Sequence, residues 1–284
     1  MKSHWIVMAG LAAMPAGPVS GVPRELLDSL LRSGLVELRA FGSGGHAGEV
    51  LSVEAFNPQA RSLRLVIPPG WRFASQDSAV QDLLVVEESV LVLAPRASGA
   101  VRCRVFCCEA SKSGPQAGSV YLAGGPADGR LVQLARHLSA HRYPDQAVQQ
   151  AVWSVSDGHP ISAIDGGDAG STLALRRLVA DVTGQSVPWY TTAYAVPEPG
   201  RLFSNEPVSV SGTVEFQQRH PGLLSIVVKD AAGRTVRVIE DGRVLEKGRF
   251  TIEVAMTVRG WPKGRYSLLF ATDGVLRERQ SFDL

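Results

Sequence analysis

The chain has 284 residues, of which 20% are charged and 45% are hydrophobic, as in a folded protein long enough for two domains. Its 29 basic and 27 acidic residues are interspersed without a block of like charge, and they give a formal net charge of +2. Nucleic-acid-binding proteins usually concentrate basic residues on one face. The sequence therefore predicts no nucleic-acid partner.

The first 21 residues have the pattern of a secretory signal peptide. Lys2 gives a basic start, an apolar run covers residues 5–14, and small residues and prolines follow. No later stretch is long and apolar enough to cross a bilayer, so we expect the protein not to be an integral membrane protein. The mature protein is expected outside the cytoplasm.

Short apolar runs dominate the first third of the mature chain. After a short predicted helix at 23–32, Gly- and Pro-rich turns separate the runs 35–41, 50–56, 62–67, 82–87, 90–93 and 101–108. Regular short strands with such turns are typical of a β-sandwich. We place this sandwich at residues 22–112.

The apolar period then becomes helical. Helices are predicted over 131–138, from Pro144 onward, and over 171–181, in a helical subdomain at 113–194. A linker at 195–200 precedes a second run of strands, which predicts an immunoglobulin-like β-sandwich at 201–284. The predicted class is mainly β with a helical subdomain.

Three cysteines lie within one predicted strand. Cys103 and Cys107 point the same way but lie about 13 Å apart at the rise of a strand, which is too far for a disulfide. Cys107 and Cys108 are adjacent and could bridge only through a strained ring. An odd number of cysteines in an exported protein leaves at least one free thiol.

Strand alternation separates the two adjacent cysteines. It places Cys107 on the apolar core face and Cys108 on the face of Arg102, Arg104 and Phe106. Nearby positive charge lowers the pKa of a thiol, so Cys108 is predicted to be the better nucleophile.

A glutamine on the second predicted helix lies at the border of the apolar stripe. Gln149 is followed one turn later by Trp153, which would shield it, whereas Gln150 points away from the core toward solvent. A border glutamine can serve chemistry, or it can simply hydrogen-bond a neighbouring backbone group. The sequence leaves both readings open.

These residues resemble the motifs of bacterial thioester domains. That family pairs a cysteine near a strand end with a glutamine in Thr-Gln-X-Ala, usually continued by Ile-Trp, and residues 148–153 read Val-Gln-Gln-Ala-Val-Trp. The order of sandwich, cysteine, loop and helices is similar over residues 27–190. The family's Tyr-Cys-Ile-Asp aligns with residues 106–109, Phe-Cys-Cys-Glu, which makes Cys107 the alternative thiol.

The resemblance implies an internal thioester formed with Gln149, and the strand phase assigns its sulfur to Cys108. Phe106 and Trp153 would shield this bond. It also implies an attachment protein, secreted or at a bacterial cell surface, with the periplasm as an alternative. Such a protein reacts once with an amine or hydroxyl of a surface protein or glycan, without turnover. We therefore expect that this protein is not an enzyme and that it needs no cofactor. The last domain resembles the immunoglobulin-like modules of exported proteins with a type IX sorting signal, on its Gly-Arg-Tyr-Ser-Leu segment at 264–268 and its basic final strand.

Three other readings are weighed. The same fold could be a structural or non-covalent binding module in which Cys108 and Gln149 are inert. A cysteine hydrolase would need Cys108 with His159, oriented by Asp157 or Asp165. The pair at residues 137 and 141, both histidines, has a metal-ligand spacing but no identifiable third ligand, so no metal site is predicted.

Overall fold

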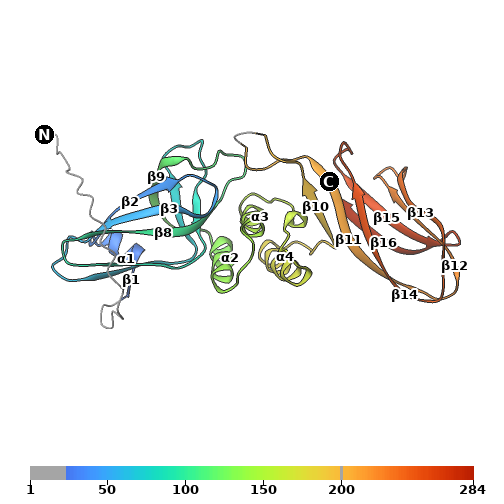
Figure 1. The fold of residues 1–284 in the computed structure, drawn as a ribbon, viewed down its shortest axis with the longest axis horizontal. Coiled ribbons are helices and arrows are strands. Elements are labelled where there is room, and N and C mark those ends of the chain that lie inside the picture. The colour runs from blue at the N-terminus through green and yellow to red at the C-terminus, as the bar shows by residue number, and fades with distance from the viewer. Residues whose placement is uncertain (1–23, 199–200) are drawn as a thin grey trace.

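The computed structural model describes residues 24–198 and 201–284. The predicted signal peptide at 1–21 lies outside the described residues. Strands greatly outnumber helices, which confirms the mainly β class. A β-rich unit, a helical layer and a second β-rich unit follow one another along the long axis of the molecule (Figure 1).

A closed barrel forms the first unit. Its strands, in spatial order, are β2 (Glu37–Ser43), β3 (Ala47–Phe56), β8 (Ser98–Cys107), β6 (Leu83–Val85), β5 (Trp71–Ser75) and β9 (Ala117–Pro126). A separate three-stranded sheet contains β1 (Arg24–Leu26), β4 (Leu63–Ile67) and β7 (Ser89–Leu93), next to the short helix α1 (Leu27–Arg32). Apolar residues from both sheets and from α1 share one core.

The barrel differs from the predicted sandwich because of two strands that the sequence did not reveal. β5 lies between turn-rich segments, and β9 carries a Gly-Gly pair that reads as a turn. β9 pairs with β2 on one side and with β5 on the other, and these pairings close the barrel. Because β9 lies beyond residue 112, the barrel extends past the predicted end of the first domain.

Three helices form a layer beside strands β6 and β8 of the barrel. They are α2 (Gly129–Ala140), α3 (Asp145–Ser156) and α4 (Ala169–Thr183), with a short 3-10 turn at Ile161–Ala163. The side chains of Asp128 and Asp168 accept backbone hydrogen bonds at the starts of α2 and α4, as N-caps do. The apolar stripes of the three helices form a second core that also includes Phe106 and Cys108 from the barrel.

The C-terminal unit consists of two antiparallel sheets around a third core. One sheet contains β10 (Tyr190–Tyr194), β11 (Pro207–Gln218) and β14 (Gly248–Thr257). The other contains β13 (Thr235–Leu245), β12 (Gly222–Lys229), β15 (Arg265–Thr272) and β16 (Val275–Asp283). The immunoglobulin-like assignment stays a prediction. β10 precedes the predicted linker, so this unit begins earlier in the chain than expected.

A buried arginine joins the helices to the C-terminal unit. Arg176 on α4 is only 4% exposed, and it donates to the carbonyls of Ile164, Ser162 and Tyr190 and to the hydroxyl of Thr191. Burial lowers the pKa of its guanidinium. These bonds connect the start of β10 to the helical layer.

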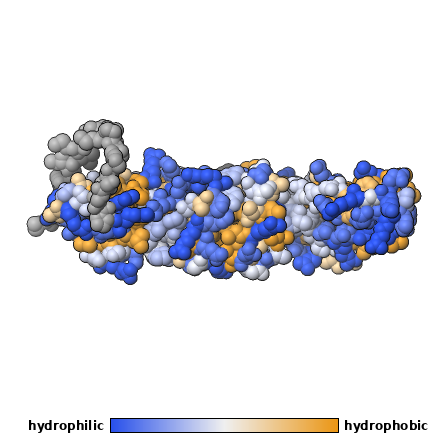
Figure 2. All heavy atoms as spheres, turned by 90° about the horizontal axis from the view of Figure 1, so that it is seen from below, coloured by the Kyte–Doolittle hydropathy of each residue, from blue (hydrophilic) through white to orange (hydrophobic). Residues whose placement is uncertain are grey.

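The surface has no single dominant apolar region on the face that Figure 2 shows, where hydrophilic and hydrophobic residues alternate along the length of the molecule. None of the helices in residues 24–198 and 201–284 has the length and apolar character needed to span a bilayer.

Candidate functional site

The end of β8 is joined to α3 by the side chain of Gln149. The amide of Cys107 donates to Gln149 Oε1 at 3.1 Å, and Gln149 Nε2 donates to the carbonyl of Cys107 at 2.8 Å. The neighbouring strand β3 ends its pairing with β8 at Ala47, opposite Phe106. The carboxamide therefore occupies the place of the missing strand and satisfies both backbone groups of Cys107.

The two adjacent cysteines lie in different cores. Cys107 belongs to the barrel core, together with Tyr121 and Trp153. Cys108 belongs to the helical core, together with Phe106. Strand alternation thus separates the two side chains as expected, and Gln149 bonds the residue on the barrel side.

A buried glutamine that the sequence analysis did not single out holds the loop after the cysteines. Gln81 is fully buried, and its Oε1 accepts from the amide of Glu109 at 2.9 Å and from Trp153 Nε1 at 3.3 Å. Its own carbonyl accepts from the hydroxyl of Tyr121 at 3.3 Å. Gln81 precedes a short strand, and nothing in the local pattern distinguishes it from a turn residue. It fixes Trp153 one helical turn beyond Gln149.

All three thiols are buried, and burial raises their pKa values. The pKa of Cys103 rises to about 11 and that of Cys107 to about 12. The pKa of Cys108 is also raised, first by burial and then by the charges of Cys107, Glu109 and Asp82. The expected activation of Cys108 by Arg102 and Arg104 is therefore not found, because the helices cover the face on which it lies.

The two residues expected to shield the bond are both buried, one in each of the two cores that meet at the strand end. Trp153 is 1% exposed and Phe106 is fully buried. Gln149 itself is 3% exposed, in agreement with a border position that the helix packing covers. Gln150 is half-buried rather than solvated, because β10 and the segment after it pack against its side of α3.

The residues of the hydrolase reading have other partners. Asp157 Oδ2 accepts from the amide of Ala110 at 2.5 Å, which ties the end of α3 to the loop after the cysteines. The ring of His159 packs on Phe203, with centroids 4.1 Å apart, and on Trp153. Within residues 24–198 and 201–284, no hydrogen bond joins His159 to a cysteine. The arrangement lacks the thiol–imidazole contact that this chemistry requires.

The histidine pair on α2 is also engaged locally. The rings of His137 and His141 stack with centroids 4.1 Å apart, and His137 Nε2 lies 2.9 Å from the hydroxyl of Tyr143. No group of three or more His, Cys, Asp or Glu side chains in the described part of the chain has a metal-ligating arrangement.

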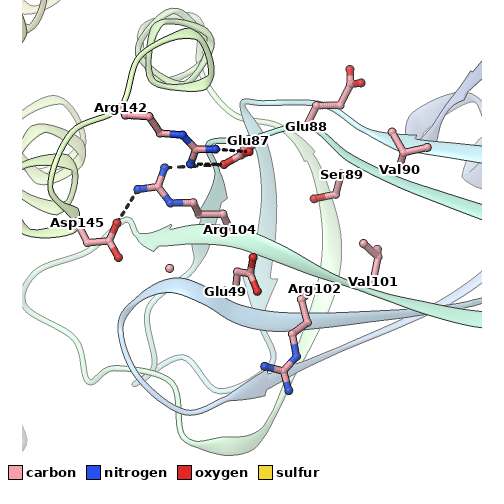
Figure 3. A pocket seen from close by; sticks show the side chains of 11 residues that line it. Glu49, Glu87, Glu88, Ser89, Val90, Val101, Arg102, Arg104, Arg142 and Asp145 are labelled. Atoms are coloured by element: carbon pink, nitrogen blue, oxygen red, sulfur yellow. Dashed lines mark hydrogen bonds and ion pairs between the residues drawn. The ribbon is translucent and has the colours of Figure 1, made fainter. Parts of the chain in front are cut away.

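A charged groove of about 480 Å³ lies beside the start of α3 (Figure 3). Arg104 donates to Asp145 at 2.6 Å, and Arg142 makes two hydrogen bonds of 3.0 Å to Glu87. Asp145 lies one helical turn before Gln149, and Arg104 lies three residues before Cys107. The ion pair and the carboxamide bonds are therefore successive links between β8 and α3.

A smaller pocket of about 230 Å³ lies on another side of α3. Gln150 of α3, Tyr194 of β10 and Phe203 from the following segment are among its lining residues. Gln150 Oε1 is buried, and no group in residues 24–198 and 201–284 donates to it. We call this depression the α3–β10 pocket.

Comparisons with known proteins do not place the chain in a family. No protein-family model matches it, and no curated protein matches it. Among solved structures, it is similar to one described as CBM51-2 in complex with GlcNAc and INT domains from Clostridium perfringens ZmpB. That similarity covers 89% of this chain and 93% of the other at 10% identity, and its TM-score of 0.20 is too low to support an argument on fold or function.

Proposed function

We propose that this protein is an exported attachment protein, in which Gln149 and Cys107 form an internal thioester that captures a nucleophile on a target. One observation carries the proposal. The carboxamide of Gln149 is buried and is held against the backbone of Cys107 by two hydrogen bonds.

The position of the carboxamide favours Cys107 over Cys108. Gln149 bonds both backbone groups of Cys107, whereas the amide of Cys108 turns the opposite way and donates to the carbonyl of Asp82 at 2.9 Å. Trp153, one turn after Gln149, packs in the same core as Cys107. The motif alignment also assigns the reactive position to Cys107.

The reaction balances without a further reagent. The sulfur of Cys107 attacks the side-chain carbonyl carbon of Gln149, the C–N bond breaks, and the thiol proton leaves with the amine as ammonia. A target amine or hydroxyl then attacks the same carbon, the C–S bond breaks, and Cys107 regains a proton. The product is one amide or ester bond per chain, so capture happens once.

Burial suits this chemistry, although it raises the thiol pKa. The starting thiol and amide are neutral, and so is the thioester, which means that no charge has to be buried in the product. A site that excludes water also protects the thioester from hydrolysis. Phe106 and Trp153 provide that exclusion on the two faces of the strand.

Intact-mass measurement tests the proposal. The purified chain should be lighter than its sequence by one ammonia, and methylamine should restore mass as an adduct on Gln149. Replacing Cys107 by Ser should abolish both signals, whereas replacing Cys108 by Ser should leave them. If only the Cys108→Ser variant loses both signals, Cys108 and not Cys107 supplies the thioester sulfur.

The second candidate is a non-covalent binding module with the same fold and an inert Cys107 and Gln149. The unpartnered Oε1 of Gln150 in the α3–β10 pocket favours it, because a buried acceptor without a donor suits a ligand that supplies one. If the chain has its full, unmodified mass, the non-covalent binding module is the one candidate of the two that remains.

The remaining parts of the proposal concern location. A cleavable signal at residues 1–21 would direct the chain out of the cytoplasm, to the extracellular space, the cell surface or the periplasm. Two antiparallel sheets around one core support an immunoglobulin-like C-terminal module, and its type IX sorting role is part of the same proposal. Fractionation of cells that express the full chain, with N-terminal sequencing of the exported form, tests both.

A further inference from the structure

The α3–β10 pocket has the chemistry of a small polar ligand site. Gln146 and Gln150 from α3 lie on one side, and Thr191 and Tyr194 from β10 lie on the other. Phe203 and its neighbours in the segment after β10 complete the wall. Its volume of about 230 Å³ is below the usual range for drug-sized ligands, so a single small ring fits better than a long chain.

Two polar groups in this pocket can hydrogen-bond a ligand. Gln150 Oε1 is buried and accepts no hydrogen bond from the described residues, which costs free energy unless a ligand or solvent donates to it. Tyr194 is a partly buried lining residue, and its hydroxyl is a second such group. Burial raises the pKa of Tyr194 to about 12, so this hydroxyl stays protonated and can donate at neutral pH.

The charges of the lining disfavour an anionic ligand. No lysine, arginine or histidine is among the described lining residues. Asp165 is the one acid there, and its Oδ1 already accepts from the amide of Gly167 at 3.0 Å. An uncharged ligand fits this environment best.

Aromatic carbon provides an apolar wall. The rings of Tyr194 and Phe203 have centroids 5.1 Å apart and are tilted by 51°. Phe203 also packs on His159 and Trp153, which fixes its position. Aromatic faces beside amide and hydroxyl groups match a ring that has an apolar face and polar edges.

We infer that the α3–β10 pocket binds one neutral sugar residue of a target glycan. A sugar hydroxyl donates to Gln150 Oε1, another accepts from the Tyr194 hydroxyl, and the ring packs against Phe203. This inference rests on the proposed attachment function but not on the thioester. It names the glycan as the target and the pocket as the first contact with it.

Saturation-transfer NMR on the full chain tests the inference, with the methyl glycosides of glucose, galactose, mannose and N-acetylglucosamine as probes. At least one of these glycosides should bind. Gln150→Met and Tyr194→Phe should each raise its Kd about two- to tenfold, which is the range for the loss of one neutral hydrogen bond. Tyr143→Phe is the matched control, because that hydroxyl contacts His137 outside the pocket. Glucuronate, an anion, should not bind.

Two results would overturn the inference. One is that no neutral glycoside binds, which indicates a pocket that holds only water. The other is that binding survives both Gln150→Met and Tyr194→Phe unchanged, which places the sugar elsewhere. If a chain with an unmodified mass binds a glycoside, the thioester proposal is wrong but the inference about the sugar-binding pocket is supported.

Discussion

Replacing Gln149 by Leu should destabilise the barrel and the helical layer. The substitution keeps an apolar side chain of similar size on α3 but removes both bonds to Cys107. Each buried backbone group left without a partner costs about 1–3 kcal/mol, or about 2–6 kcal/mol for the two. Burial of the leucine returns about 2 kcal/mol, so we expect a net loss of up to about 4 kcal/mol.

Gln150→Met provides the matched control on the same helix. Its side chain is half-buried, and no group in the described residues donates to its Oε1. The substitution therefore removes no hydrogen bond and should not lower the free energy of unfolding by more than about 0.5 kcal/mol. Urea unfolding of both variants is compared with that of parent protein whose unmodified intact mass shows that Gln149 is still a carboxamide. Hydrogen exchange of a peptide that includes Cys107 gives the local readout.

A Gln149→Leu variant that is more stable than the parent chain would refute the reasoning. Unchanged protection of the Cys107 amide in Gln149→Leu would refute it as well, since that amide has Gln149 as its acceptor. A loss of stability without a change in exchange at Cys107 would place the effect in helix packing instead.

Four further outcomes follow from buried groups. Native protein at neutral pH should resist iodoacetamide at Cys103, Cys107 and Cys108, and full alkylation without denaturant would contradict their burial. Burial raises the thiol pKa values, so the contribution of the thiols to stability should be constant below about pH 8.5 and should be lost between there and about pH 12, because the unfolded chain loses these protons first. Urea midpoints that stay flat between about pH 8.5 and 12 would oppose this. Asp157→Ala should cost about 1–3 kcal/mol by orphaning the amide of Ala110, and Asp157→Asn should recover part of it in the same unfolding assay. Arg176→Met should cost about 3 kcal/mol, measured by thermal unfolding, because several buried acceptors lose their donor.

Local patterns predicted the helices and most strands well. The apolar stripe of α3 and its start at Pro144 were both readable, because helical periodicity and capping depend on residues close in the chain. The closure of the barrel was not readable, since β9 reaches β2 and β5 across long sequence separations. Its Gly-Gly pair suggested a turn, and only the pairing partners make that segment a strand.

The candidate site was predictable in part for the same reason. Strand alternation separated Cys107 from Cys108, and the helical wheel distinguished Gln149 from Gln150. Neither pattern could show that the helices cover the outer face of β8, which buries Cys108 and raises its pKa. The role of Gln81 depends on a loop and a tryptophan distant in the chain, so no local signal identifies it.

The intact mass of the purified chain, measured before and after methylamine treatment, tests the Cys107–Gln149 thioester most directly. We expect the untreated chain to be lighter than its sequence by one ammonia. Methylamine should then add to Gln149 and release Cys107 as a thiol. The thioester would be contradicted if the parent chain and both the Cys107→Ser and Cys108→Ser variants had their unmodified masses and did not react with methylamine.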